Sequence, residues 1–145
     1  MAEDPIGPMG GGCLCGAVRF TATPAKLEMD VCHCGMCRKW SGGVFMCVPC
    51  GTDVAVEDGA SLKSFASSQW GERVFCGNCG TSLFWRMQDG SATMVSLHAF
   101  DDGTPFRFAE EIFIDEKPGL YAFANDTRKL TGAQVMAAFA SGQGS

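Results

Sequence analysis

The stretch FCGNCGTSLFW, residues 75–85, carries two cysteines that bracket a tight turn. Its first part, Cys76-Gly-Asn-Cys79, has the form of a zinc knuckle, because Gly and Asn tolerate the positive φ that such a turn needs. Gly80 follows and leaves the chain free to reverse into the apolar run that ends at Trp85. A knuckle supplies two of the four ligands of a structural zinc site, so two more must come from elsewhere in the chain.

The C-x-C in GGCLCGAVRF is the natural second half of this site. A four-thiolate zinc would clip the first strand to the central hairpin and contribute directly to folding. The alternative is four buried free cysteines, since Cys often packs as a small hydrophobe, but the paired spacing and the flanking glycines favour the metal. We therefore predict a closed structural zinc site on Cys13, Cys15, Cys76 and Cys79.

A third cluster, C-x-C-x-x-C in VCHCGMCRKW, puts Cys32, Cys34 and Cys37 within six residues. One loop can therefore wrap three faces of a single metal ion. Catalytic zinc has three protein ligands and one open position, so the cluster predicts a catalytic site. A second structural zinc completed by a distant ligand is the alternative, and the other candidate donors are His98, Cys47 and Cys50.

Three residues beside this cluster are candidates for supporting roles. His33 lies between two ligands, so its ring is expected to point away from the metal, where it could carry a proton. Three thiolates give the zinc centre a formal charge of −1, and nearby cations are expected to help its chemistry. Arg38 and Lys39 are the adjacent cations, and they could also bind a carboxylate of the substrate.

The remaining C-x-x-C, Cys47-Val-Pro-Cys50, has redox spacing but lies in a strand-like run. Strand geometry points residues three apart to opposite faces, so both are predicted to be buried apolar cysteines. The tryptophans could wall a substrate pocket, but aromatic residues of a small β domain are more often core: Trp40, Trp70 and Trp85.

The composition restricts the function further. The chain has 145 residues and a net charge of 11 − 16 = −5, without a basic stripe, which argues against nucleic acid as a partner. No apolar run approaches the roughly 20 residues that span a bilayer, and we find no signal peptide, so no membrane partner is predicted. An odd number of cysteines and no export signal oppose a disulfide scaffold and favour a reducing cytoplasm.

The chain alternates short strands with turns rich in Gly, Pro and Asp, which predicts a mainly β fold with little helix. Residues 1–12 are predicted to be a flexible leader and 13–145 a single domain. The candidate helices are one turn at Gly35–Trp40 and a short C-terminal helix at Gln134–Ala140, preceded by a capping box of Thr131 and Gln134. The candidate strands are Ala17–Ala22, Val44–Val48, Val54–Val56, Leu62–Ala66, Val74–Cys76, Ser82–Met87, Thr93–His98 and Glu111–Ile114.

Three motifs together resemble the glutathione-dependent formaldehyde-activating enzyme family, which includes the centromere-protein-V-like proteins. They are G-x-C-x-C-G-x-V-R-F at 11–20, C-H-C-x-x-C-R-K at 32–39 and F-C-x-x-C-G-T-x-L at 75–83. The C-terminal stretch, with Phe100-Asp-Asp and EIFIDEKP from residue 111, agrees in family order. The similarity covers roughly residues 11–130.

The resemblance implies a β-tent fold of mostly antiparallel sheets stapled by zinc, with the structural and catalytic zincs on the two cysteine groups named above. The family's founding activity condenses glutathione with formaldehyde to S-(hydroxymethyl)glutathione and is classed as a carbon–sulfur lyase. The implied function is a zinc-dependent carbon–sulfur lyase or synthase acting on a small thiol adduct. A scaffold or protein-interaction module with two structural zincs is the alternative, and an oligomer is possible.

Overall fold

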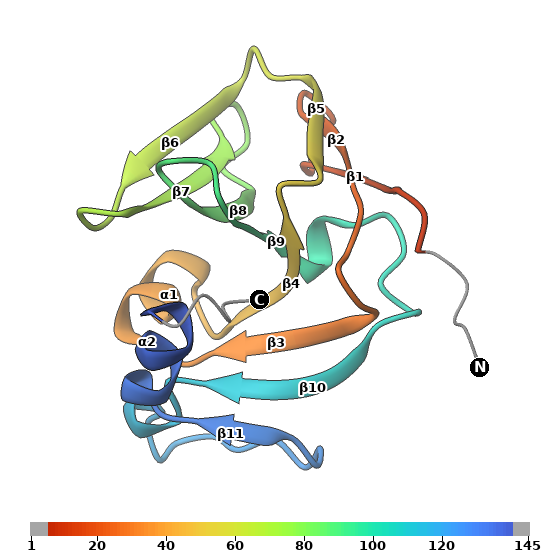
Figure 1. Ribbon diagram of the computed structural model, residues 1–145. Coiled ribbons are helices and arrows are strands. Elements are labelled where there is room, and N and C mark those ends of the chain that lie inside the picture. The colour runs from red at the N-terminus through yellow and green to blue at the C-terminus, as the bar shows by residue number, and fades with distance from the viewer. Residues whose placement is uncertain (1–5, 141–145) are drawn as a thin grey trace.

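The computed structural model describes residues 6–140 and shows a mainly β fold (Figure 1). The described chain contains eleven strands, two α-helices and two short 3₁₀ helices. The strands are β1 (Met9–Gly12), β2 (Arg19–Ala22), β3 (Glu28–Cys32), β4 (Phe45–Gly51), β5 (Val54–Asp58), β6 (Leu62–Ala66), β7 (Gly71–Cys76), β8 (Ser82–Met87), β9 (Thr93–Ser96), β10 (Arg107–Ile112) and β11 (Arg128–Leu130). The helices are α1 (Gly35–Ser41), α2 (Gly132–Ala140), η1 (Leu97–Ala99) and η2 (Ile114–Glu116).

The strands form two sheets, one of three strands in the order β1-β2-β5 and one of eight strands. The larger sheet has the order β11-β10-β3-β4-β9-β8-β7-β6, and it is antiparallel except that β10 pairs in parallel with both β3 and β11. In Figure 1 this sheet is strongly bent, with β6–β8 in the upper half and β3, β10 and β11 in the lower half. The helices α1 and α2 lie together on the side toward which these two halves open.

The prediction of a mainly β fold with a short C-terminal helix is confirmed. The Thr131 hydroxyl accepts from the Gln134 amide at 3.2 Å, and the Gln134 side chain accepts from the Thr131 amide at 2.8 Å, so the predicted capping box begins α2. Within the predicted leader, Met9–Gly12 pair with β2 as strand β1, and the flexible leader over residues 1–12 stays a prediction. Residues 1–5 lie outside the described part, and the single domain over 13–145 stays a prediction.

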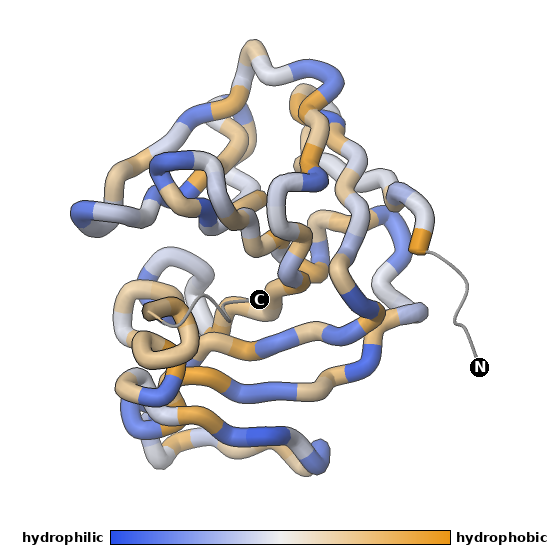
Figure 2. The backbone as a smooth tube through the Cα atoms, viewed as in Figure 1, coloured by the Kyte–Doolittle hydropathy of each residue, from blue (hydrophilic) through white to orange (hydrophobic). Residues whose placement is uncertain are grey.

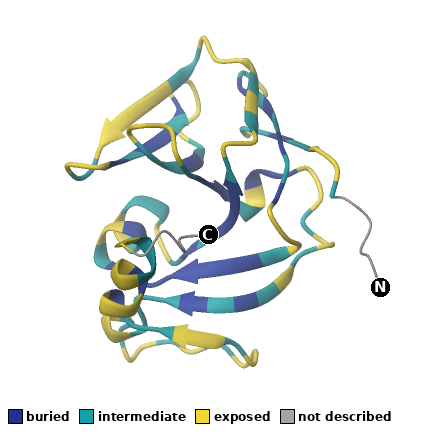
Figure 3. Cartoon of the chain, viewed as in Figure 1, coloured by how far each residue is buried: buried dark blue, intermediate teal, exposed yellow. Residues whose placement is uncertain are grey.

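Three strands were not predicted, and each is short or interrupted by charge. Asp30 and Glu28 lie in β3, Arg128 and Lys129 in β11, and glycines make up most of β1. In Figure 2 hydrophobic and hydrophilic residues alternate along β3, and in Figure 3 the same strand is largely buried. The larger sheet therefore contains a strand that the sequence pattern does not predict, because charged side chains interrupt its apolar residues.

The buried side chains form two clusters of different composition. The larger one packs Phe20 against Phe84 and Phe100, with ring centroids 5.0 and 5.9 Å apart. The smaller one surrounds the cysteines of α1 and includes Trp40 and Trp85 at its edge. Among the described helices, none has the length and apolar character needed to cross a bilayer.

Candidate metal centres and the pocket beside them

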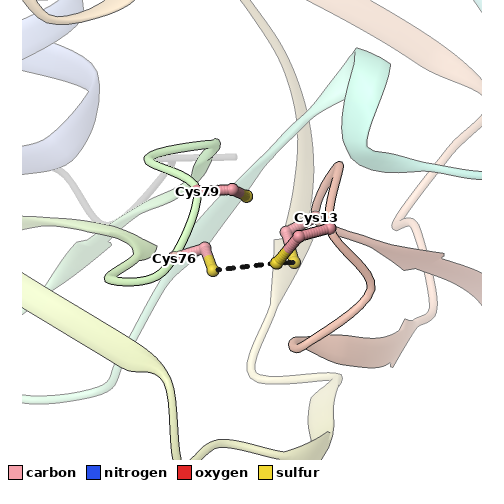
Figure 4. A group of neighbouring side chains, drawn as sticks. Cys13, Cys76 and Cys79 are labelled. Atoms are coloured by element: carbon pink, nitrogen blue, oxygen red, sulfur yellow. Dashed lines mark hydrogen bonds between the residues drawn. The ribbon is translucent and has the colours of Figure 1, made fainter.

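The four cysteines predicted to form the closed site come together from the β1–β2 loop and the β7–β8 turn (Figure 4). All four Sγ atoms lie within 4.8 Å of one another; the Cys13 and Cys15 sulfurs are 3.6 Å apart, and the Cys15 and Cys76 sulfurs are 3.9 Å apart. Zinc–sulfur bonds of about 2.3 Å in a tetrahedron put sulfur atoms about 3.8 Å apart. The group therefore fits a four-thiolate zinc ion.

Hydrogen bonds hold these sulfurs in place. The Val18 amide donates to Cys13 Sγ, and the Asn78 side-chain amide donates to Cys15 Sγ, both at 3.2 Å. A hydrogen bond with the Thr81 hydroxyl at 3.1 Å lowers the pKa of the Cys79 thiol to about 5. Gly80 has φ +82°, as the knuckle requires, whereas Asn78 contributes through its side chain rather than through a positive φ.

The second group consists of Cys32 at the end of β3 and Cys34 and Cys37 on α1, with their Sγ atoms also within 4.8 Å of one another. Cys34 is the N-cap of α1, and its sulfur accepts from the Cys37 amide at 3.3 Å. Within residues 6–140 no fourth His, Cys, Asp or Glu joins this group. The three thiolates fit a zinc ion with one position left for another ligand.

Hydrogen bonds among Cys32, Cys34 and Cys37, the cysteine trio, give the three thiols different pKa values. Hydrogen bonds from Cys32 and Cys37, opposed by burial, lower the pKa of Cys34 to about 2. The hydrogen bond with Cys34 raises the pKa of Cys32, because one thiolate is stabilised at the expense of its neighbours. A positive group beside the trio is therefore important for holding more than one thiolate.

That positive group is Arg73 of β7. It is 3 % exposed, its Nη1 donates to Cys37 Sγ at 3.5 Å, and its guanidinium lies 5.3 Å from the centroid of the Trp40 ring. Its Nε is buried and has no hydrogen-bond partner. No sequence motif marks this residue, because only the pairing of Arg73 with Trp85 across β7 and β8 places it on the same side of the sheet as the cysteines.

Strand register explains why a pocket forms beside the trio. Side chains directly paired across neighbouring strands share a face of the sheet, and so do alternate residues along a strand. Cys32 pairs with Ile112 and with Phe45, and Trp85 pairs with Met94 and with Arg73. These side chains line one pocket, which α1 and α2 close with further apolar residues: Met36, Val135, Met136 and Phe139. A core role was predicted for the tryptophans, but Trp70 and Trp85 line this pocket.

His33 is placed on the other side of its loop. Its side chain is completely buried, with Nε2 2.7 Å from Glu111 Oε1 and Nδ1 2.9 Å from the Tyr121 hydroxyl. Burial opposes ionisation of Glu111, but hydrogen bonds with Thr127 and His33 outweigh it and lower the pKa of that carboxyl. Both imidazole nitrogens are engaged, so the geometry favours a role in holding the loop, and proton transfer by His33 stays a prediction.

Of the other predicted residues, Cys47 lines the pocket, whereas Arg38, Lys39, His98 and Cys50 do not. Arg38 Nε donates to the His33 carbonyl at 2.9 Å, and Lys39 is exposed; neither lines the pocket, so their binding of a substrate carboxylate stays a prediction. His98 is exposed on η1 and is not part of the second cysteine group. Cys47 and Cys50 are buried, as predicted, and burial raises the pKa of Cys50 to about 12 and that of Cys47 well above its usual value.

Comparison with known proteins identifies relatives over most of the chain. Residues 8–116 match the family model described as glutathione-dependent formaldehyde-activating enzyme. A Schizosaccharomyces pombe protein named as an uncharacterized lyase is 34% identical over 127 residues, which cover 87% of this chain and 93% of the relative. A Halomonas elongata protein named "Putative glutathione-dependent formaldehyde-activating enzyme" is 34% identical over 83 residues, or 51% of this chain and 53% of that protein.

A solved structure supports the fold alone. The crystal structure of a Rhodobacter sphaeroides protein matches with a TM-score of 0.56 at 21% identity, and the match covers 64% of this chain and 88% of that one. At this identity the similarity supports a shared arrangement of the strands and gives no information about chemistry.

Proposed function

Because this chain belongs to the glutathione-dependent formaldehyde-activating enzyme family, we propose that it is a zinc-dependent enzyme that forms or breaks a carbon–sulfur bond between a small thiol and an aldehyde. The names of its relatives support an enzyme of the lyase type. Glutathione and formaldehyde are the first candidate pair, since the family description names both. We further propose that the enzyme works in the cytoplasm, where glutathione is abundant and thiols stay reduced.

One observation carries this proposal: the described part of the chain gives the second cysteine group three thiol ligands and no fourth, and these thiols face a pocket. In this assignment Cys13, Cys15, Cys76 and Cys79 hold a structural zinc, and Cys32, Cys34 and Cys37 hold a catalytic one. A zinc ion held by these three cysteines would supply the Lewis acidity that lowers the pKa of a substrate thiol and favours its thiolate.

In the proposed reaction, the protein acts on the oxygen atom of the aldehyde. In the forward direction the thiol sulfur bonds to the aldehyde carbon, the π-electron pair of the C=O bond moves to oxygen, and the proton lost from sulfur reaches that oxygen through water. Among residues 6–140 Arg73 is the one charged side chain that lines the pocket, and its unpartnered Nε can donate to this oxygen as negative charge develops. In the reverse direction the oxygen gives up its proton, the C=O bond reforms and the C–S bond breaks.

The test is the rate of exchange between free formaldehyde and S-(hydroxymethyl)glutathione, followed by nuclear magnetic resonance with zinc-loaded protein. We expect acceleration over the uncatalysed reaction and its loss in Cys34→Ser. The matched control is Cys50→Ala, which removes a buried cysteine outside the site and should keep the rate. A rate that Cys34→Ser leaves unchanged would mean that the second zinc is structural, and the scaffold alternative would replace the enzyme.

A further inference from the structure

The walls of the pocket are almost entirely apolar. Apart from the cysteines and Arg73, every described side chain that lines it is aliphatic, aromatic or methionine, and the described lining contains no carboxylate, imidazole or lysine. Three of the large apolar side chains that the described surface exposes lie there: Met36 is 50%, Trp70 43% and Met136 45% exposed. The apolar character therefore continues from the cysteines to the solvent.

The pocket is small, with a volume of about 100 Å³. An engineered apolar cavity of about 150 Å³ binds benzene in another protein. The volume of this pocket therefore suits a compact apolar group of the size of a phenyl ring or a branched alkyl chain.

This lining is a poor match for glutathione beyond its sulfur. The tripeptide carries two carboxylates and an ammonium group, and leaving such charges without partners against apolar side chains is costly. Arg38 and Lys39, the cations predicted to bind a carboxylate, do not line the pocket. Formaldehyde, in turn, has no substituent that could use the apolar volume. The polar group of an adduct that would find a partner in this pocket is its oxygen, which Arg73 can bind.

We propose that the natural adduct of this enzyme carries an uncharged apolar substituent, which packs between Trp85, Phe45 and α2 while Arg73 binds its single oxygen. This inference rests on the proposed function, since the sulfur of the adduct is placed at the three cysteines. The substituent comes either from an apolar thiol or from an apolar aldehyde, and the chemistry is the same addition of S–H across C=O, with no oxidant or reductant.

The first test compares three thiols that differ in polarity: benzyl mercaptan, 2-mercaptoethanesulfonate and glutathione. Quenching of tryptophan fluorescence in the zinc-loaded protein reports binding, because Trp70 and Trp85 line the pocket. We expect benzyl mercaptan to bind at least tenfold more tightly than either charged thiol. Met136→Glu should narrow this ratio by putting a carboxylate beside the bound group, whereas Leu120→Glu, at an 83% exposed residue outside the pocket, should not change it.

The exchange assay then identifies the source of the substituent. Faster exchange with benzyl mercaptan and formaldehyde than with glutathione and formaldehyde places the apolar group on the thiol; faster exchange with glutathione and isobutyraldehyde places it on the aldehyde. Tightest binding and fastest exchange with glutathione and formaldehyde would overturn this inference and leave the proposed function standing. If no thiol binds, the proposed function fails. Benzyl alcohol then tests whether the pocket binds apolar ligands at all. Quenching of the tryptophan fluorescence by benzyl alcohol would support an apolar ligand site, and no quenching would overturn that site.

Discussion

At the scale of single residues, the two most informative side chains are charged and buried. Arg73 and Glu111 are each 3% exposed or less, and burial of a charge is costly unless a partner compensates. Glu111 has its partners in His33 and Thr127. In the described part of the chain, Arg73 contacts the Cys37 thiol and the face of the Trp40 ring, and its Nε has no hydrogen-bond partner, so we propose that it binds the substrate.

Replacing Arg73 should therefore reduce turnover. We expect Arg73→Gln to lower kcat by about 10²- to 10³-fold, the effect of losing one donor to a developing oxyanion, with a smaller change in KM. Arg73→Lys should recover part of kcat because it keeps the charge. The control is Arg86→Gln on the neighbouring strand, outside the pocket. Zinc content and melting temperature, measured on each variant, separate a catalytic loss from misfolding; equal kcat in both Gln variants would remove Arg73 from the mechanism.

Glu111 is expected to act on stability. Glu111→Ala leaves the buried His33 without its 2.7 Å partner and should cost about 3 kcal/mol of unfolding free energy. Tyr121→Phe removes only the hydroxyl on the other ring nitrogen and should cost about 1 kcal/mol. Denaturant unfolding measures both. Indistinguishable losses would show that the carboxylate does not anchor the loop that carries the cysteines.

At the scale of elements, sequence patterns predict what is local and miss what depends on register. The knuckle at Cys76–Cys79, the turn of helix after Cys34 and the capping box of α2 follow from spacing within a few residues, and all are present. The pocket depends on which strands are neighbours. β10 lies beside β3 although 74 residues separate Cys32 from Arg107, and no periodicity in either segment specifies that pairing.

The same reasoning separates the two cysteine groups by their effect on folding. Cys13→Ala or Cys76→Ala breaks a clip between elements about 60 residues apart, whereas Cys34→Ala changes one loop. We expect the first two to lower the melting temperature by roughly 10 °C, the shift that a loss of about 3 kcal/mol produces in a domain of this size. Cys34→Ala should lower it much less and abolish activity. Equal melting temperatures in the three variants would contradict the division into structural and catalytic groups.

At the scale of the whole molecule, the two cysteine groups lie at different places on one bent sheet. The four-cysteine group joins the small sheet to the end of β7, and the three-cysteine group faces the pocket under α1 and α2. The motifs of the sequence predict both groups, because zinc ligands occur in pairs with short spacing. They do not predict Arg73 or the apolar walls, since these side chains come from seven separate elements (α1, β4, β7, β8, β9, β10 and α2) and the loops between them, which only the fold brings together.

Zinc content tests this division in the intact protein. We expect about two zinc ions per chain after purification without chelator, and about one in Cys34→Ala, from the number of ligands in each group. Elemental analysis of both proteins gives the result. A folded chain without zinc would contradict both assignments.

The central claim is that a substrate thiol reaches the position left open by Cys32, Cys34 and Cys37. Benzyl mercaptan and benzyl methyl sulfide present the same apolar group to the pocket and differ in whether the sulfur can become a thiolate. Calorimetric titration of both into the zinc-loaded protein measures that difference directly. The account predicts that the thiol binds at least tenfold more tightly and that Cys34→Ala removes its advantage. Equal affinity for the two compounds would mean that the thiol does not reach the metal, and would contradict the proposed carbon–sulfur chemistry.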